Sequence, residues 1–145
     1  MSLDGDYDDD NVFAKIIRGD MPAAKVFEDA HVLVFMDVFP QSRGHTLVVS
    51  KKSRARNLLD VEAEVLSQVM GDVQRVARAM RAALKPDGIV LTQFNGAAAG
   101  QTVFHLHFHL IPRYAGEAPK PHGEGGMADP AELAAIAKTI AAEIA

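Results

Sequence analysis

Three histidines at a strict spacing of two constrain the fold of this chain more than any other feature. Successive side chains of a β-strand point to opposite faces, so a strand over Gln101–Arg113 would place all three imidazoles on one face. Buried imidazoles need hydrogen-bond partners, and adjacent ones disfavour each other's charged form, so this row would make a poor core. The pattern therefore predicts a functional site. The row consists of His105, His107 and His109, and the alternating apolar residues are Leu106, Phe108 and Leu110.

A loop rich in small residues, Asn95–Thr102, lies directly before the histidines. Glycine and alanine let a backbone approach an anion closely, and consecutive N–H groups can form a phosphate-binding nest. The side chains of Asn95, Gln101 and Thr102 add donors at its edge. Next to three aligned histidines, this loop indicates phosphate chemistry.

Apolar periodicity and turn-forming residues predict an α+β domain of antiparallel strands with a few helices. Asp60 is the predicted N-cap of the longest helix, and Asp129 followed by Pro130 predicts the start of the last one. The glycines and prolines of Ala115–Ala128 predict an extended loop. The expected helices are Val12–Arg18, Asp60–Leu84 and a C-terminal helix after Asp129, and the expected strands are Lys25–Glu28, His31–Asp37, His45–Ser50, Gly88–Phe94 and the histidine strand.

Length and charge narrow the function further. The 145 residues, 48% of them hydrophobic, fit one domain over residues 11–145. Five acids fall within the first ten residues, which predicts a disordered acidic tail over residues 1–10. No apolar run is long enough to span a membrane, and the N-terminus does not resemble a signal peptide, so we expect a cytoplasmic protein. The basic run Lys51–Arg56 is interpreted as a solvated loop, so no nucleic-acid partner is expected.

Residues 105–111, HLHFHLI, match the signature of the histidine-triad (HIT) nucleotide-binding family, in which histidines alternate with apolar residues. The resemblance continues in the expected order through about Asn11 to Arg113, and it is greatest to the nucleoside phosphoramidate hydrolases of that family. The further segments that carry it are Phe13–Pro22, Phe35–Gln41, Gly44–Val49 and Asn95–Gln101.

The resemblance implies nucleotidyl transfer without a metal or organic cofactor. His107 would attack the α-phosphorus to form a covalent nucleotidyl-histidine, which water then cleaves. Neutral imidazole is a competent nucleophile near neutral pH, provided that its other nitrogen is held protonated by an acceptor. The family uses a backbone carbonyl for this. His109 would donate to phosphate oxygens, and His105 would orient its neighbours in association with His45.

The resemblance also implies the binding residues and the assembly. A purine nucleoside would lie among Val12, Phe13, Ile16, Phe35 and Val38. Asp37 would accept from the ribose hydroxyls, and Asn95, Gln101, Thr102 and the backbone N–H of Val103 would hold the phosphate. Family members have a sheet of about five strands, and they are usually homodimers whose sheets join through the long helix and a neighbouring strand.

Other interpretations stay open. Three aligned imidazoles can converge on zinc, but there is no cysteine and no obvious fourth carboxylate ligand nearby. Some bacterial relatives hold a structural zinc through ligands whose positions here read Asn11, Ala14 and Ser53, so no metal is expected. The substrate could be a dinucleoside polyphosphate, or the protein could be a nucleotide-sensing module with incidental turnover. Phe13 and Phe35 could be plain core, and Asp37 could cap a turn.

Overall fold

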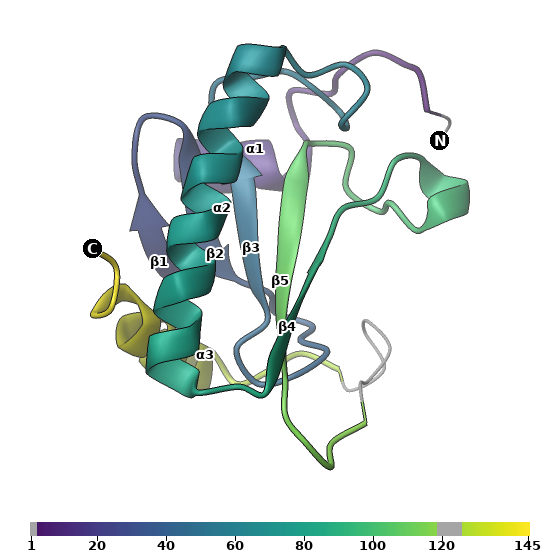
Figure 1. The fold of residues 1–145 in the computed structure, drawn as a ribbon. Coiled ribbons are helices and arrows are strands. Elements are labelled where there is room, and N and C mark those ends of the chain that lie inside the picture. The colour runs from purple at the N-terminus through teal and green to yellow at the C-terminus, as the bar shows by residue number, and fades with distance from the viewer. Residues whose placement is uncertain (1–2, 119–125) are drawn as a thin grey trace.

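The centre of the domain is a five-stranded sheet, paired antiparallel throughout, in the order β1-β2-β3-β5-β4 (Figure 1). The computed structural model describes residues 3–118 and 126–145. The predicted α+β class, the five strands, the long helix and the C-terminal helix are confirmed. The strands are β1 (Lys25–Glu28), β2 (Val32–Met36), β3 (Thr46–Ser50), β4 (Gly88–Thr92) and β5 (His107–Arg113), and the helices are α1 (Val12–Arg18), α2 (Ala63–Leu84) and α3 (Pro130–Ala141).

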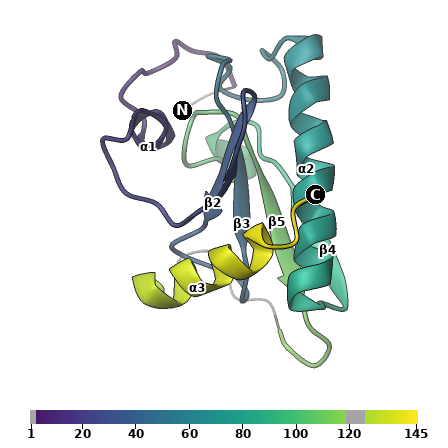
Figure 2. The same ribbon diagram turned by 90° about the vertical axis from the view of Figure 1, so that its left-hand side faces the viewer.

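Helices cover both faces of the sheet. Figure 2 shows α1 on one side of the strands and α2 on the other, with α3 crossing beside β1 and β2. Alternation along the strands divides the apolar residues between these two faces. The larger cluster joins Val34, Val48 and Phe108 to Val69, Val73 and Val76 of α2 and to Leu133, Ile136 and Ile140 of α3. The smaller cluster joins Leu33, Phe35, Leu47 and Val49 to Phe13 and Ile16 of α1.

The register of β5 against β3 decides which face the histidines occupy. His107 lies opposite Val49, and His109 lies opposite Leu47. Both partners belong to the smaller cluster, which α1 covers. The histidine row therefore faces α1, and the alternate residues of β5 pack against α2.

The histidine strand begins later than the sequence predicts. We expected a strand from Gln101, but β5 begins at His107. The preceding segment is held by the β3 side of the sheet instead: the Leu106 amide donates to the Ala55 carbonyl, and the Ser50 amide donates to the Leu106 carbonyl. His105 therefore lies just before the regular strand.

The long helix also begins later than predicted. Asp60 is not its N-cap: α2 starts at Ala63, with Glu62 in the capping position. The Asp60 carboxylate accepts instead from the amides of Arg56 and Asn57, so it stabilises the turn that precedes the helix. For α3 the prediction is confirmed, because the Asp129 side chain accepts from the Ala131 amide and Pro130 opens the helix.

The N-terminal segment differs from the disordered tail expected for residues 1–10. Residues 3–10 lie against the domain, because their acids meet basic side chains: Asp9 pairs with Arg54, and Asp10 pairs with Arg18. Asn57 donates to the Leu3 carbonyl at 3.0 Å.

The basic run Lys51–Arg56 is not uniformly solvated, as the sequence led us to expect. Arg56 is only 1% exposed. Its guanidinium lies 4.9 Å from the centre of the Phe104 ring and has no hydrogen-bond partner among the residues described. Segment 119–125, which includes His122 and half of the expected loop Ala115–Ala128, lies outside the described residues. Within the described part of the chain, no helix has the length and apolar character needed to cross a membrane.

Candidate active site

The three histidines of the row lie side by side beneath α1. The ring centres of His107 and His109 are 5.0 Å apart, and Phe13 of α1 meets His107 edge-on at 4.8 Å and His105 at 6.3 Å. The exposed fractions are 1% for His105, 9% for His107 and 8% for His109. The two histidines within β5 therefore retain a little contact with solvent, whereas His105 is enclosed.

The tautomer of His107 follows from its contact with the backbone. Its Nδ1 lies 2.6 Å from the carbonyl oxygen of His105. A carbonyl only accepts, so Nδ1 carries the hydrogen and donates it. In the neutral ring Nε2 then has the lone pair, which is the arrangement that a nucleophilic imidazole requires.

His45 is linked to His109, not to His105 as predicted. The Gln41 amide donates to His45 Nδ1 at 3.0 Å, so the neutral ring carries its hydrogen on Nε2. That Nε2 lies 2.9 Å from His109 Nδ1. His45 therefore donates to His109, and neutral His109 carries its own hydrogen on Nε2. The pairing arises because β3 runs beside β5 in a register that sets His45 near His109.

His105 has different partners. Its Nε2 donates to the Ser50 carbonyl at 2.5 Å, and its Nδ1 lies 2.6 Å from the Tyr7 hydroxyl. Burial lowers the pKa of His105, although the hydrogen bond to Ser50 opposes that shift. Sequence reasoning missed Tyr7, because it lies in the segment interpreted as a tail. A lone aromatic among acids was the only signal available.

Most of the residues predicted to hold a nucleoside come together. Phe13, Ile16 and Phe35 are buried in the smaller apolar cluster, and Val12 packs partly against it. The rings of Phe13 and Phe35 meet edge-on with their centres 5.5 Å apart, so both residues contribute to the apolar core, as the sequence also allowed. Val38 is 38% exposed and is not part of that cluster.

Asp37 lies at the end of β2, where both of its carboxylate oxygens have neighbours. Oδ1 accepts from the Phe39 amide at 2.8 Å, which is the turn-capping contact left open by the sequence. Oδ2 lies 3.4 Å from Nε2 of His45. Asp37 is buried, with 4% of the residue exposed. A carboxylate has about four acceptor sites, so these contacts do not exhaust Asp37 as an acceptor.

The small-residue loop is shaped by its own hydrogen bonds. Gln101 accepts from the Gly96 amide and donates both amide hydrogens, to the carbonyls of Arg56 and Val103. Asn95 accepts from the amides of Leu58 and the Gln93 side chain. Both side chains therefore support the loop: the amide hydrogens of Gln101, its predicted phosphate donors, already have partners, and Asn95 is held through its carbonyl oxygen.

The backbone of this loop is partly committed as well. The amides of Ala99, Gly100 and Gln101 donate to carbonyls within the loop, so they do not form the open nest that the sequence suggested. Gly100 adopts φ +107°, a conformation that favours glycine. Thr102, which follows, is exposed, and the Val103 side chain packs against the apolar cluster.

One group of described residues has the spacing of a metal site, but the tautomer of His45 in that group disfavours metal binding. Asp37, His45 and His109 present ligand atoms within 4.8 Å of one another. To bind a metal through Nε2, neutral His45 would carry its hydrogen on Nδ1, where it would face the N–H of Gln41. The donor set therefore suits a hydrogen-bonded relay better than a cation.

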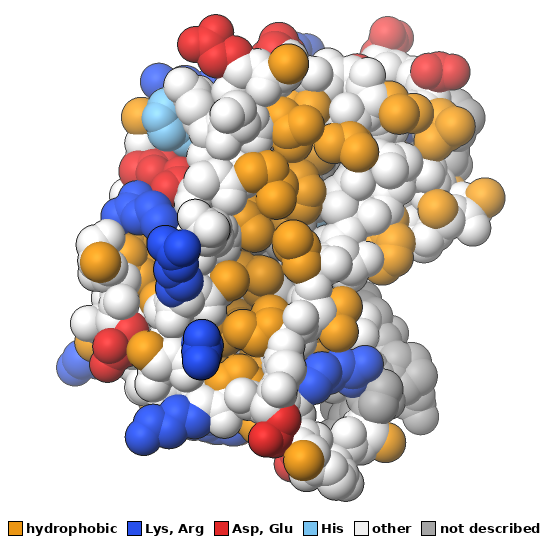
Figure 3. All heavy atoms as spheres, in the orientation of Figure 1, with side chains coloured by type: hydrophobic (Ala, Val, Ile, Leu, Met, Phe, Trp, Pro, Cys, Tyr) orange, Lys and Arg blue, Asp and Glu red, His pale blue; other side chains and the backbone are white. Residues whose placement is uncertain are grey.

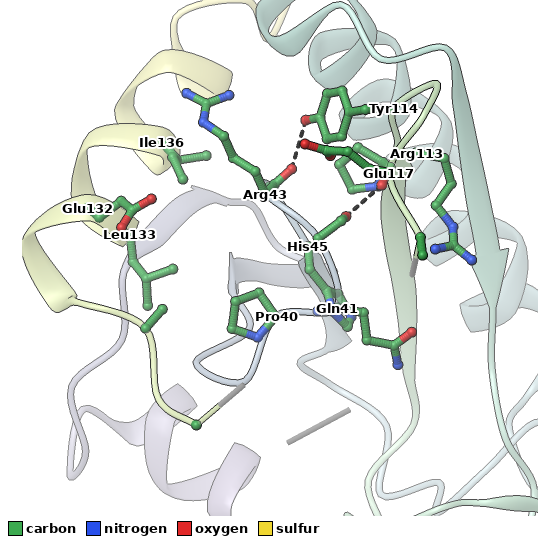
Figure 4. A pocket seen from close by; sticks show the side chains of 16 residues that line it. Pro40, Gln41, Arg43, His45, Arg113, Tyr114, Glu117, Glu132, Leu133 and Ile136 are labelled. Carbon is green, nitrogen blue, oxygen red and sulfur yellow. Dashed lines mark hydrogen bonds between the residues drawn. The ribbon is translucent and has the colours of Figure 1, made fainter. Parts of the chain in front are cut away.

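A separate cavity of about 520 Å³ lies between the loop that enters β3, the end of β5 and α3. Figure 4 shows Tyr114 donating to the Arg43 carbonyl across this region, with Leu133 and Ile136 of α3 on the other side. His45 contributes to its lining, but the three histidines of the row do not. The cavity and the histidine row are therefore separate features of the surface, and His45 lies between them.

Comparison with known proteins agrees with this geometry. The HIT domain family model matches residues 18–116. Protein hit of Bacillus subtilis is 40% identical over 139 residues, covering 92% of this chain and 94% of its own length. Adenosine 5'-monophosphoramidase hnt1 of Schizosaccharomyces pombe is 33% identical over 141 residues, covering 92% and 97%. The crystal structure of a HIT-like protein involved in cell-cycle regulation from Bartonella henselae, with an unknown ligand, has a TM-score of 0.90 and 46% identity, covering 96% and 99%.

Proposed function

The chain belongs to the HIT family of nucleotide-binding hydrolases and transferases, and from this we propose that it hydrolyses purine nucleoside 5′-phosphoramidates or related mixed anhydrides. The observation that carries the proposal is the hydrogen bond from His107 Nδ1 to the His105 carbonyl. It leaves Nε2 of His107 unprotonated in the neutral ring. This nitrogen lies at the edge of an apolar cluster that could receive a purine nucleobase. The phosphoramidase relative from Schizosaccharomyces pombe supports the choice of bond.

In the first proposed step, Nε2 of His107 attacks the α-phosphorus. A bond forms between that nitrogen and phosphorus, the bond to the leaving amine breaks, and the amine takes up a proton from solvent. In the second step, water attacks the same phosphorus and gives up a proton to solvent, and the bond to His107 breaks, releasing the nucleoside monophosphate. Both steps concentrate negative charge on the phosphoryl oxygens, so a donor placed there accelerates both.

His109 is the proposed donor. His45 donates to His109 Nδ1, so neutral His109 carries its hydrogen on Nε2, on the opposite side of the ring. A hydrogen bond from that atom to a phosphoryl oxygen strengthens as charge develops. His45 therefore acts through His109 as a positioning residue. Thr102 and the Val103 amide are the remaining proposed phosphate donors, and Asn95 and Gln101 hold the loop that presents them.

The proposed nucleoside site is the apolar cluster under α1. Phe13, Ile16 and Phe35 offer apolar surface to a purine, and Val12 and Val38 lie at its margin. Asp37 is the proposed acceptor for the ribose hydroxyls, with its carboxylate oriented by the Phe39 amide. No metal or organic cofactor takes part in the proposed reaction.

The test is steady-state hydrolysis of adenosine 5′-phosphoramidate, with a chelator present, by wild type, His107→Ala and the control variant His31→Ala. His31 lies outside the row, before β2. We expect turnover by wild type and His31→Ala, and a loss of at least about a thousandfold in His107→Ala, because a nucleophile is removed. Equal rates in all three proteins, or none in wild type, would overturn the proposal. Tight binding of adenosine monophosphate without turnover would instead favour the sensing module.

We also propose a homodimer, formed through α2 and β4. Strand β4 is an edge of the described sheet, and an edge strand presents backbone groups to a partner strand. Figure 3 shows hydrophobic side chains gathered along α2 and the neighbouring β4. Leu91 is 47% exposed on the face that α2 covers, and Val65, Leu66 and Met70 of α2 are only partly buried. A second copy of this chain would cover this apolar surface and pair the open edge.

A further inference from the structure

We propose that Tyr7 is a positioning residue for the nucleophile: its hydroxyl fixes the ring of His105, whose backbone carbonyl in turn orients His107. The effect on turnover rests on the proposed function, whereas the effect on the histidine tautomers does not. The inference gives the acidic N-terminal segment, residues 4–10, a role in the active site.

The hydrogen bonds at the two ring nitrogens of His105 have a defined direction. Nε2 lies 2.5 Å from the Ser50 carbonyl, which can only accept, so the ring hydrogen is on Nε2. Nδ1 of the neutral ring must then accept, and the Tyr7 hydroxyl at 2.6 Å donates to it. The ring is 1% exposed, so solvent has little access to take over this donor role. Losing the hydroxyl would leave a buried acceptor unsatisfied.

The position of the His105 ring affects His107 through the backbone carbonyl of His105. His105 comes just before β5, so its own position depends on its side-chain contacts as well as on the neighbouring ladder. Ser50 and Tyr7 hold the imidazole from opposite nitrogens. The carbonyl of the same residue accepts from His107 Nδ1 at 2.6 Å, and this contact selects the tautomer of the nucleophile. A displacement of His105 therefore changes the acceptor on which His107 depends.

Tyr7 and its neighbours in the N-terminal segment are themselves held against the domain. The Arg54 guanidinium lies 4.9 Å from the centre of the Tyr7 ring and also pairs with Asp9. Arg18 donates to the Asp9 carbonyl at 2.5 Å. The acidic residues of the segment thus fasten it to basic groups at the end of α1 and after β3, and this holds the phenol on His105. Burial raises the pKa of Tyr7, which keeps the phenol a donor.

The test compares full-length wild type, Tyr7→Phe and Tyr114→Phe. The chain has two tyrosines, and the hydroxyl of Tyr114 also donates to a carbonyl, that of Arg43, away from the histidine row. Nitrogen-15 NMR of the labelled histidines reports the tautomer and hydrogen bonding of each ring. In wild type we expect His105 protonated on Nε2 and His107 protonated on Nδ1. Only Tyr7→Phe should shift the Nδ1 signals of both rings.

Turnover of adenosine 5′-phosphoramidate supplies the second readout. Loss of one hydrogen bond should lower kcat about fivefold in Tyr7→Phe, with KM changed by less than about twofold and Tyr114→Phe unchanged. Unshifted histidine signals in Tyr7→Phe, or an equal loss of kcat in both variants, would overturn the proposal. If wild type shows no turnover, the proposed function fails and the NMR shifts still decide the role of Tyr7. If Tyr7→Phe does not fold, the wild-type NMR spectrum decides. A His105 ring protonated on Nδ1 could not accept from Tyr7, and this result would overturn the proposal.

Discussion

The protonation of several side chains in this protein depends on a neighbouring side chain. Asp72 and Asp29 are the clearest case away from the histidines. Asp72 of α2 is 5% exposed. Burial, together with the Asp29 carboxylate, raises the pKa of Asp72 to about 6. Burial opposes ionisation of Asp29, but hydrogen bonds with Asp72 and with the amides of His31 and Val32 outweigh it and lower the pKa of Asp29. Arg75 lies close to both carboxylates. The folded state therefore keeps Asp72 protonated up to about pH 6, and the carboxyl ionises above that pH.

This pair predicts a specific pH dependence of stability. A carboxyl whose folded pKa lies above its unfolded value of 3.8 contributes stability at pH below 3.8 that is lost as the pH rises through about 6. Asp72→Asn should abolish this component and be more stable than wild type at pH 7.5, by on the order of 1–2 kcal/mol. Denaturant unfolding of both proteins from pH 4 to pH 8 measures it. Parallel stability curves for wild type and variant would contradict the prediction.

At the scale of elements, α1 matters more than its seven residues suggest, because it carries Phe13 against His107. Asn11 caps it by accepting from the Ala14 amide at 2.9 Å. Asn11→Ala should lower the free energy of unfolding by about 1 kcal/mol and also raise KM, because the proposed nucleoside site includes this helix.

The matched control for that prediction is the cap of α3. Asp129 accepts from the Ala131 amide at 3.1 Å, so Asp129→Ala loses the same kind of contact. It should lower stability by a similar amount, about 1 kcal/mol, without changing KM. Unfolding and steady-state assays on both variants check this. A KM that rises equally in the two, or in neither, would show that α1 does not form the nucleoside site.

Elements defined by local signals were predicted well from the sequence. The bounds of α1 and the start of α3 match, because turn residues and the Asp129-Pro130 cap act on their own neighbours. Elements whose ends depend on competing contacts were predicted less well. Asp60 could serve either a turn or a helix, and the structure shows the turn. The beginning of β5 depends on distant partners such as Ala55, which no periodicity reveals.

The site shows the same limit. The histidine row and most of the apolar cluster under α1 could be predicted, because the motif and the family resemblance identify them. The partner of His45 could not, since it depends on the register between two strands. Nor could the contact between Tyr7 and His105, which are 98 residues apart in the chain. Gln101 looks like a phosphate donor in sequence, and only the folded loop shows where its amide hydrogens go.

At the scale of the whole molecule, the apolar surface over α2 and β4 predicts self-association. Leu91→Asp should convert the dimer to a monomer, because it places a charge on the surface that the second copy would cover. Met21→Asp is the control, since Met21 is 40% exposed in the loop after α1. Sedimentation equilibrium of the three proteins gives the mass directly. A monomeric wild type, or a dimeric Leu91→Asp, would contradict the proposed interface.

In the proposed mechanism, His107 becomes covalently attached to the nucleotide during turnover. The most direct measurement is mass spectrometry of protein quenched during hydrolysis of adenosine 5′-phosphoramidate, under alkaline conditions that preserve phosphoramidates, followed by peptide mapping. We predict an adenylyl group on His107 in wild type and none in His107→Ala. An adduct on another residue, or turnover with no adduct even at the shortest quench times, would contradict the proposed mechanism.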